Sequence, residues 1–206
     1  MEIRVNPTRM ELTRLKKRLA VAVRGHKLLK DKLDELMKNF FDLVEENRRL
    51  RERVEAELAL ANGGFAMARA IMSREVLEAA IITSRGRAVL EAKTQSRMNV
   101  EVPVFKLAME QANGYGFGLT ETSGELDEAV RSLAETFASL VQLAQVEKTV
   151  ELMAAEIERT RRRVNALEHV LIPQLREKAK FITMKLDENE RGNLTRLMKV
   201  KEMVRQ

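Results

Sequence analysis

Few side chains in this sequence are of types that carry out chemistry. Cysteine is absent, which excludes thiolate catalysis and disulfides. The only histidines are His26 and His169, and a zinc site at either would need further ligands that the sequence does not obviously supply. No G-x-x-x-x-G-K-[ST] phosphate loop is present. We therefore predict no catalytic residue, no bound cofactor and no metal, and thus no enzyme activity of the chain by itself.

Two other patterns have more than one interpretation. Gly114, Gly116 and Gly118 form a spaced run, but without the strand–turn–helix context of a dinucleotide site they favour a turn. A basic run with arginine at 159, 161, 162 and 163 fits a solvated helix face or a partner contact equally well. Nucleic acid is not expected as a partner, because one Tyr and no Trp leave little for base stacking.

The elements that position these residues are long helices. From Leu12 to Val54 the apolar positions advance by three and four residues in turn, which is typical of a left-handed coiled coil. His26 and Asn47 fall on this apolar stripe, where a polar side chain can fix the register. An additional step of four marks a stutter before the stripe continues to Met72. The stripe comprises Leu12, Leu15, Leu19, Ala22, His26, Leu29, Leu33, Leu36, Phe40, Leu43, Asn47, Leu50, Val54, Leu58, Ala61, Phe65, Ala68 and Met72.

The start of this helix carries two signals, Asn6-Pro7 and a capping box of Thr8 with Glu11. They differ by about two residues, and both stay open. Gly63-Gly64 is expected to kink the helix, which continues to about residue 82.

A second apolar stripe follows Gly124. Pro173 lies within it; proline removes a helix hydrogen bond and clashes one turn back, so we expect a kink there and no helix end. The stripe comprises Leu126, Val130, Leu133, Phe137, Leu140, Val146, Val150, Met153, Ile157, Thr160, Val164, Leu167, Leu171, Leu175, Ala179, Ile182 and Leu186.

The residues between the stripes predict a β-hairpin. Residues 89–96 and 100–107 read as strands, and Pro103 restricts its strand to an edge. The predicted organisation is a long N-terminal helix over 1–75, a middle region over 76–123 with a short helix, a hairpin at about 89–107 and a Gly-rich loop, and a long helix over 124–206. The fold class is mainly all-α, a long antiparallel two-helix left-handed coiled coil forming one elongated domain.

Charge is unevenly distributed along this chain. Residues 1–30 hold nine Lys and Arg against two Asp and Glu, a net +7, and residues 159–206 hold thirteen against six, again +7. An antiparallel hairpin brings both ends to one basic tip, which should seek an acidic or polar partner. The predicted contact residues are Arg9, Arg14, Lys16, Lys17, Arg18, Arg191, Arg196, Lys199 and Lys201, with Pro173, His26 and Asn47 as structural residues.

Four segments carry a family resemblance: NPTR at 6–9, GHKLLKDK at 25–32, RMNVEVP at 97–103 and RVNALEHVLIP at 163–173. With them the chain resembles the D subunit of archaeal and vacuolar-type rotary ATPases over nearly its whole length, and the last segment is the most specific. One departure is Asn99, where the family often has glycine in the hairpin turn.

The resemblance implies a central rotor shaft of an A-type or V-type ATP synthase, which couples ATP synthesis or hydrolysis to proton or sodium transport. It implies that the end with both termini inserts into the catalytic hexamer of A and B subunits, that the middle binds the F subunit, and that the opposite end meets the cup-like subunit on the membrane ring. The implied location is the cytoplasmic face of the cell membrane, peripheral to it and without direct insertion. A coiled-coil chaperone or tether of the prefoldin type, which also joins two helices through β-hairpins, is the main alternative; a nucleic-acid-binding hairpin is the other.

Overall fold

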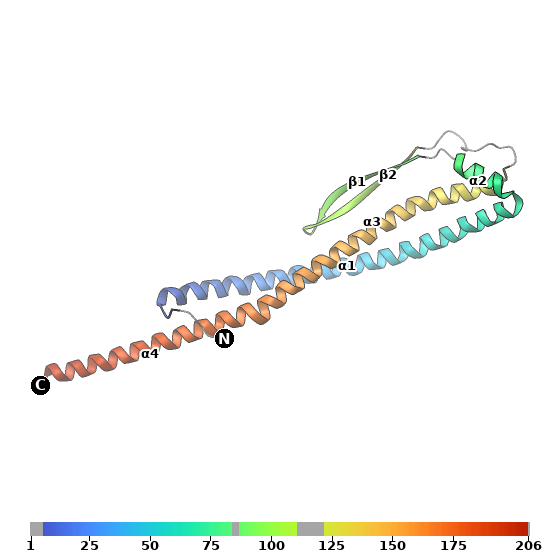
Figure 1. Ribbon diagram of the computed structural model, residues 1–206. Helices are drawn as coiled ribbons and strands as arrows, with labels where there is room; N and C mark the ends of the chain where they lie inside the picture. Colours follow the sequence, from blue (N-terminus) through green and yellow to red (C-terminus); the bar gives the residue numbers. More distant parts are fainter. Residues whose placement is uncertain (1–5, 84–86, 111–121, 206) are drawn as a thin grey trace. The chain divides into compact units, whose positions relative to one another are not determined.

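A computed structural model describes residues 6–83, 87–110 and 122–205 of this chain. In chain order the elements are α1 (Arg9–Ile71), α2 (Arg74–Thr83), β1 (Arg87–Arg97), β2 (Val100–Glu110), α3 (Gly124–Ala166), a single π-helical turn η1 (Leu167–Leu171) and α4 (Ile172–Arg205) (Figure 1). The mainly helical class with a two-stranded antiparallel sheet in the middle is confirmed. The predicted glycine loop around Gly116 lies outside the described residues.

The chain divides into two compact units, residues 36–156 and residues 1–35 with 157–206. We call the first the hairpin unit and the second the terminal unit. In each, a stretch of α1 packs antiparallel against a later helix of the chain.

In the hairpin unit, α1 packs against α3. Arg51 on α1 contacts Glu147 on α3 at 2.5 Å, whereas Ala68 near the end of α1 packs with Leu126 near the start of α3. The residue numbers on α3 thus decrease as those on α1 increase, so the two helices are antiparallel. The short helix α2 closes this end by placing Ala80 and Leu77 on the same apolar cluster.

Helix α1 begins and ends at identifiable signals. The hydroxyl of Thr8 accepts a hydrogen bond from the Glu11 N–H at 3.2 Å, so of the two predicted starts the one with Thr8 as N-cap is used. The Thr8 N–H donates to the carbonyl of Asn6. At the other end α1 passes through Gly63-Gly64 as helix and stops at Ile71. Ser73 then caps α2, since its hydroxyl accepts from the N–H of Val76 at 3.4 Å.

The hairpin is longer than expected, with eleven residues in each strand. Its two-residue turn has positive φ at both Met98 (55°) and Asn99 (64°), which defines the type I′ turn that matches strand twist. Val100 and Val102 are buried. The Asn39 amide on α1 donates to the sulfur of Met98 at 3.0 Å, which holds the turn end of the hairpin.

In the terminal unit, the start of α1 packs against α4. Leu15, Leu175 and Ile182 form its buried cluster. Arg9 pairs with Glu190, and His26 lies near Glu168 on η1, so this pair of helices is also antiparallel.

The predicted seam of the last helix is wrong at Leu171. Its side chain is exposed, and Ile172 is buried in its place. The cause is the π-turn, in which the N–H of Ile172 reaches back five residues to the carbonyl of Leu167. The turn adds one residue, so the seam steps by five from Leu167 to Ile172 and then resumes at Leu175.

Pro173 is the second residue after this π-turn. In a regular α-helix its ring would clash with the carbonyl four residues earlier. The wider turn just before it accommodates the ring, and α4 continues beyond it for more than thirty residues. The prediction that Pro173 does not end the helix is confirmed.

The predicted seam of α3 is wrong at Leu133 and Phe137. Both are about 40% exposed, whereas Ala129, Thr136 and Ser139 are buried. Small side chains let α1 and α3 approach closely, and the two large residues lie beside the contact. The hydroxyl of Thr136 donates to the carbonyl of Ser132 at 2.8 Å, which satisfies it without a partner on α1.

Candidate partner-binding surfaces

The nine cations predicted to contact a partner are all exposed and all lie in the terminal unit. Arg9 pairs with Glu190, and Arg14 lies 3.7 Å from Glu11. The other seven make no ion pair with any residue that the structure describes, which leaves their charge available to a partner. These seven are Lys16, Lys17, Arg18, Arg191, Arg196, Lys199 and Lys201.

The end of α4 is more apolar than the charge pattern indicated. Every residue from 187 to 205 is exposed. Leu194, Leu197 and Met198, each more than half exposed, follow the i, i+3, i+4 spacing of one helix face. The predicted contact residues are all cations and do not include these side chains, although their helical spacing was a readable signal.

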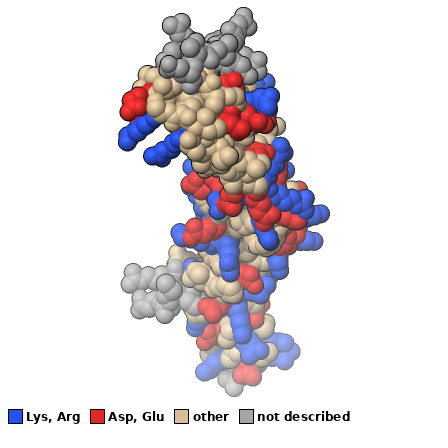
Figure 2. Space-filling view, turned by 90° about the vertical axis from the view of Figure 1, so that its right-hand side faces the viewer, with Lys and Arg blue, Asp and Glu red and all other residues tan. Residues whose placement is uncertain are grey.

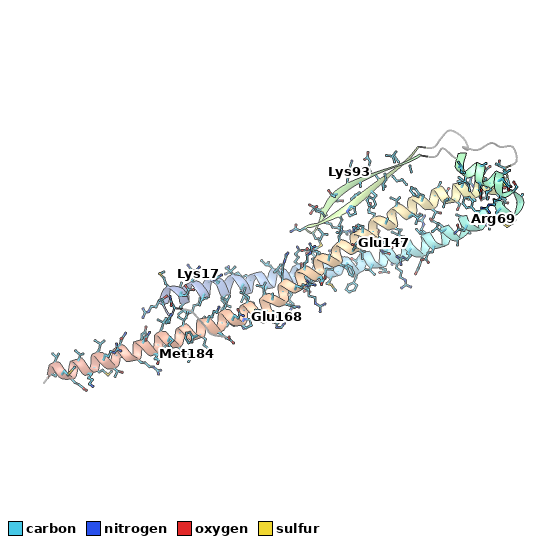
Figure 3. The ribbon with its side chains drawn as sticks, in the orientation of Figure 1. Lys17, Arg69, Lys93, Glu147, Glu168 and Met184 are labelled. Atoms are coloured by element: carbon cyan, nitrogen blue, oxygen red, sulfur yellow. The ribbon has the colours of Figure 1, made fainter. Side chains whose placement is uncertain are left out.

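A groove lies on the terminal unit between α1 and the π-turn. Its volume is about 650 Å³. Lys17, Arg18 and Lys178 supply its positive charge, and Leu171, turned outward by the π-turn, supplies part of its apolar lining (Figure 3 labels Lys17 and Glu168). The shape and charge suit an acidic segment with apolar side chains.

The hairpin unit carries an exposed apolar end. Met67, Ile71, Ile81 and Ile82 expose between 52% and 84% of their surface. Figure 2 looks onto this end and shows few charged side chains over much of it. Clustered exposed apolar side chains mark interaction sites.

Ion pairs within the hairpin unit shift the pKa values of two groups. Glu147 raises the pKa of Arg51, first by a hydrogen bond and then by its charge. Hydrogen bonds from Arg53 and then Ser139 lower the pKa of Glu57. The Arg51–Glu147 pair and the Ser139 hydrogen bond to Glu57 link α1 to α3, whereas Arg53 and Glu57 both lie on α1. All these interactions favour the charged form.

The three predicted structural residues have different surroundings. The ring Nε2 of His26 lies 3.3 Å from Oε2 of Glu168; its neighbour is thus Glu168, while His169 is exposed. Asn47 is half-buried on the seam and makes no hydrogen bond with a described residue. Within the described ranges, no three His, Asp or Glu side chains gather as metal ligands would, and no helix has the length and apolarity to cross a membrane.

Comparison with known proteins supplies the family. A sequence model for the D subunit of ATP synthase matches residues 11–202. The chain belongs to the ATP synthase D-subunit family. It is 59% identical over 205 residues to the D subunit of the V-type ATP synthase of Acetivibrio thermocellus, covering 98% of this chain and 92% of that protein.

Other relatives in this family align over a similar length. The protein of the same name from Thermoanaerobacter sp. is 56% identical over 203 residues, with 98% and 97% of the two chains covered. That from Clostridium novyi is 55% identical over 206 residues, with 98% and 95% covered. The family resemblance stated from the four sequence segments is therefore confirmed, and the chain is a component of a rotary ATPase.

Proposed function

We propose that this chain is the central rotor shaft of a V-type ATP synthase. It couples ATP synthesis or hydrolysis on a catalytic hexamer to proton or sodium transport through a membrane ring, and contributes no catalytic group itself. The observation that carries the proposal is membership of the D-subunit family. Antiparallel helix pairs support it, together with a terminal unit that bears seven cations unpaired among the described residues.

The terminal unit is the part proposed to lie within the hexamer of A and B subunits. A shaft that turns inside a collar needs a surface that meets three sites in succession without a deep specific pocket. Exposed cations beside Leu194, Leu197 and Met198 suit that requirement, because apolar contact and diffuse charge tolerate sliding better than fixed hydrogen bonds do.

The hairpin unit is the part proposed to meet the F subunit and the cup-like subunit of the ring. Its exposed apolar end, including Ile71 and Ile82, is the surface we assign to the cup-like subunit. The proposed location is the cytoplasmic face of the membrane, as a peripheral part of the bound complex.

Reconstitution with purified subunits tests the rotor role. The full chain should support ATP turnover coupled to rotation of a bead attached to the ring side. Chains that begin at Leu19 or end before Leu186 should lose that coupling. Unchanged coupled turnover with either truncation would contradict the proposal.

Charge reversal tests the terminal unit more finely. Lys16→Glu with Lys17→Glu should weaken assembly with the hexamer at least about tenfold. The two new carboxylates would then face the acidic or polar surface that the basic tip is expected to contact on the hexamer. The matched control is Arg48→Glu with Arg49→Glu, two exposed arginines of the hairpin unit already paired with Glu52 and Glu45. Equal effects of the two double variants would argue against a contact at the basic end.

One observation favours the chaperone alternative. The apolar side chains on the end of α4 are a surface that a holdase would present to non-native proteins. A pull-down from lysate separates the two functions: ATPase subunits in fixed stoichiometry support the rotor, and a heterogeneous set of unfolded proteins without them supports the chaperone.

A further inference from the structure

The two outer edges of the β-hairpin differ. Thr94 of β1 pairs with Pro103 of β2. Because proline has no N–H, this is a pair without ladder hydrogen bonds, and its peptide groups point away from the partner strand. Phe105, two residues on, has the same orientation and donates its N–H to Oε1 of Gln145 on α3 at 2.7 Å.

The outer edge of β2 is therefore closed in its middle, at Pro103 and Phe105. One of its outward donors is missing at Pro103, and the next is used by α3 at Phe105. No additional strand can pair along it without breaking the contact with Gln145. A strand added along the full length of this hairpin therefore has to pair with β1.

The outer edge of β1 is open. The same alternation makes the N–H and C=O groups of five residues point outward, and each of these residues is exposed. No outward N–H or C=O group of these five residues makes a hydrogen bond with a residue in the described ranges. An open edge of this length is a template for another strand. The five residues are Ala88, Leu90, Ala92, Thr94 and Ser96.

We infer that β1 binds an extended segment of another subunit of the synthase by strand addition. This rests on the proposed function, which places the chain in a multisubunit complex. Backbone hydrogen bonds supply the affinity in this mode, and side chains of alternate residues supply the specificity.

The side chains of β1 define the chemistry of the added segment. Val89 and Leu90 are 39% and 51% exposed. We therefore expect apolar residues in the part of the added segment that lies beside them. The Nζ atom of Lys93 lies 3.7 Å from Oε2 of Glu91, so the two charges offset each other (Figure 3 labels Lys93). Arg97 has no ion-pair partner among the described residues, so an acidic residue belongs beside it. The strand RAVLEAKTQSR holds three cations and one anion; two copies would repel, whereas an acidic segment would not.

Amide hydrogen exchange at single-residue resolution tests the inference in the isolated chain and in the purified intact complex. Odd-numbered amides of β1 from 89 to 95, which bond to β2, should be protected in both. Even-numbered amides from 88 to 96 should exchange fast in the isolated chain and at least about 100-fold more slowly in the complex, since only the added strand protects them.

A proline scan provides a second test. Ala92→Pro removes an outward N–H and no ladder bond, whereas Ala92→Thr keeps that N–H and suits a strand. Ala92→Pro should weaken capture of the partner subunits at least about tenfold, with Ala92→Thr near wild type. Circular dichroism of both variants, and the exchange data on the unmodified chain, separate lost binding from lost folding.

Each outcome decides a different point. Even-numbered amides that exchange equally fast in a complex containing the chain overturn strand addition and leave the rotor proposal intact. Protection of those amides in the isolated chain, with doubled mass at high concentration, overturns the heterologous partner in favour of a second copy. Failure to co-purify with ATPase subunits overturns the proposed function and this inference together.

Discussion

Gly64 of α1 and Ala129 of α3 lie so close that a Cβ atom added to Gly64 would be 3.0 Å from the Cβ of Ala129. Neither atom could rotate away, so the helices themselves would have to separate. A Cβ added to the neighbouring Gly63 would meet nothing within 4 Å. The pair thus marks the point where the hairpin unit depends on close helix contact.

Gly64→Ala should lower the free energy of unfolding by about 1 kcal/mol, because overpacking costs more than the gain in helix propensity. Gly63→Ala, the matched control, should raise it by about 0.5–1 kcal/mol. Urea denaturation followed by circular dichroism measures both. Equal stabilisation by the two substitutions would contradict the packing argument.

The π-turn predicts an unusual deletion. Removing the exposed Val170 together with Pro173→Ala should give a regular helix with the same seam and a stability within about 1 kcal/mol of wild type. Removing Val170 alone should cost about 3 kcal/mol, because the proline then lies in an α-helical turn. Deletion of Arg161, in regular helix, is the control and should be worse than the double change. Thermal melts rank the three, and a double variant no more stable than the single deletion would refute the interpretation.

His26→Leu should change the stability by no more than about 1 kcal/mol. Its partner Glu168 is half exposed, with 53% of the side chain accessible, and ion pairs of this kind contribute little. Glu168→Gln should have an equally small effect. A loss of several kcal/mol in denaturant melts of either variant would mean that the His26–Glu168 contact governs register.

Acid should weaken the hairpin unit at Glu57. The Arg53 and Ser139 hydrogen bonds hold the pKa of Glu57 below its ordinary value of 4.5, so this carboxylate stabilises the fold above that value. The contribution is lost as the pH falls through the lower, folded-state pKa. NMR titration should find the Glu57 midpoint below 4.5, and Arg53→Gln should move it upward. A midpoint unmoved by Arg53→Gln would assign the shift elsewhere.

Asn99→Gly should stabilise the hairpin by about 0.5–1 kcal/mol. Asn99 has φ of 64°, a left-handed conformation that glycine adopts without the steric cost of a Cβ. Asn99→Val, with a β-branched side chain, should destabilise it by more than that. Exchange rates of the β1 amides report both changes, and an unchanged rate in Asn99→Val would show that the turn can take another form.

The seam of α1 was predictable from sequence because a large apolar residue marks most of its turns. All its members, from Leu12 through Val54 to Met72, are buried or half-buried. The α3 seam was not, because its contact residues are small and polar. A search for apolar residues selects Leu133 and Phe137 over Thr136 and Ser139, although close approach favours the small pair.

The shift at the π-turn escaped prediction for a different reason. Pro173 signalled that the helix was disturbed, but nothing in residue type distinguishes a kink from an added residue. The basic terminal unit was predictable from charge counts alone. The open edge of β1 required the pairing of Thr94 with Pro103, which depends on a register that the sequence leaves undefined.

The π-turn has a practical consequence for hybrid proteins. The heptad repeat before Leu167–Leu171 and the heptad repeat after it differ in phase by one residue. A chimera that joins the N-terminal part of one relative to the C-terminal part of another must therefore contain a single copy of this additional residue. With two copies or none, every hydrophobic contact beyond the junction would rotate toward water by about 100°, the turn of one helical residue.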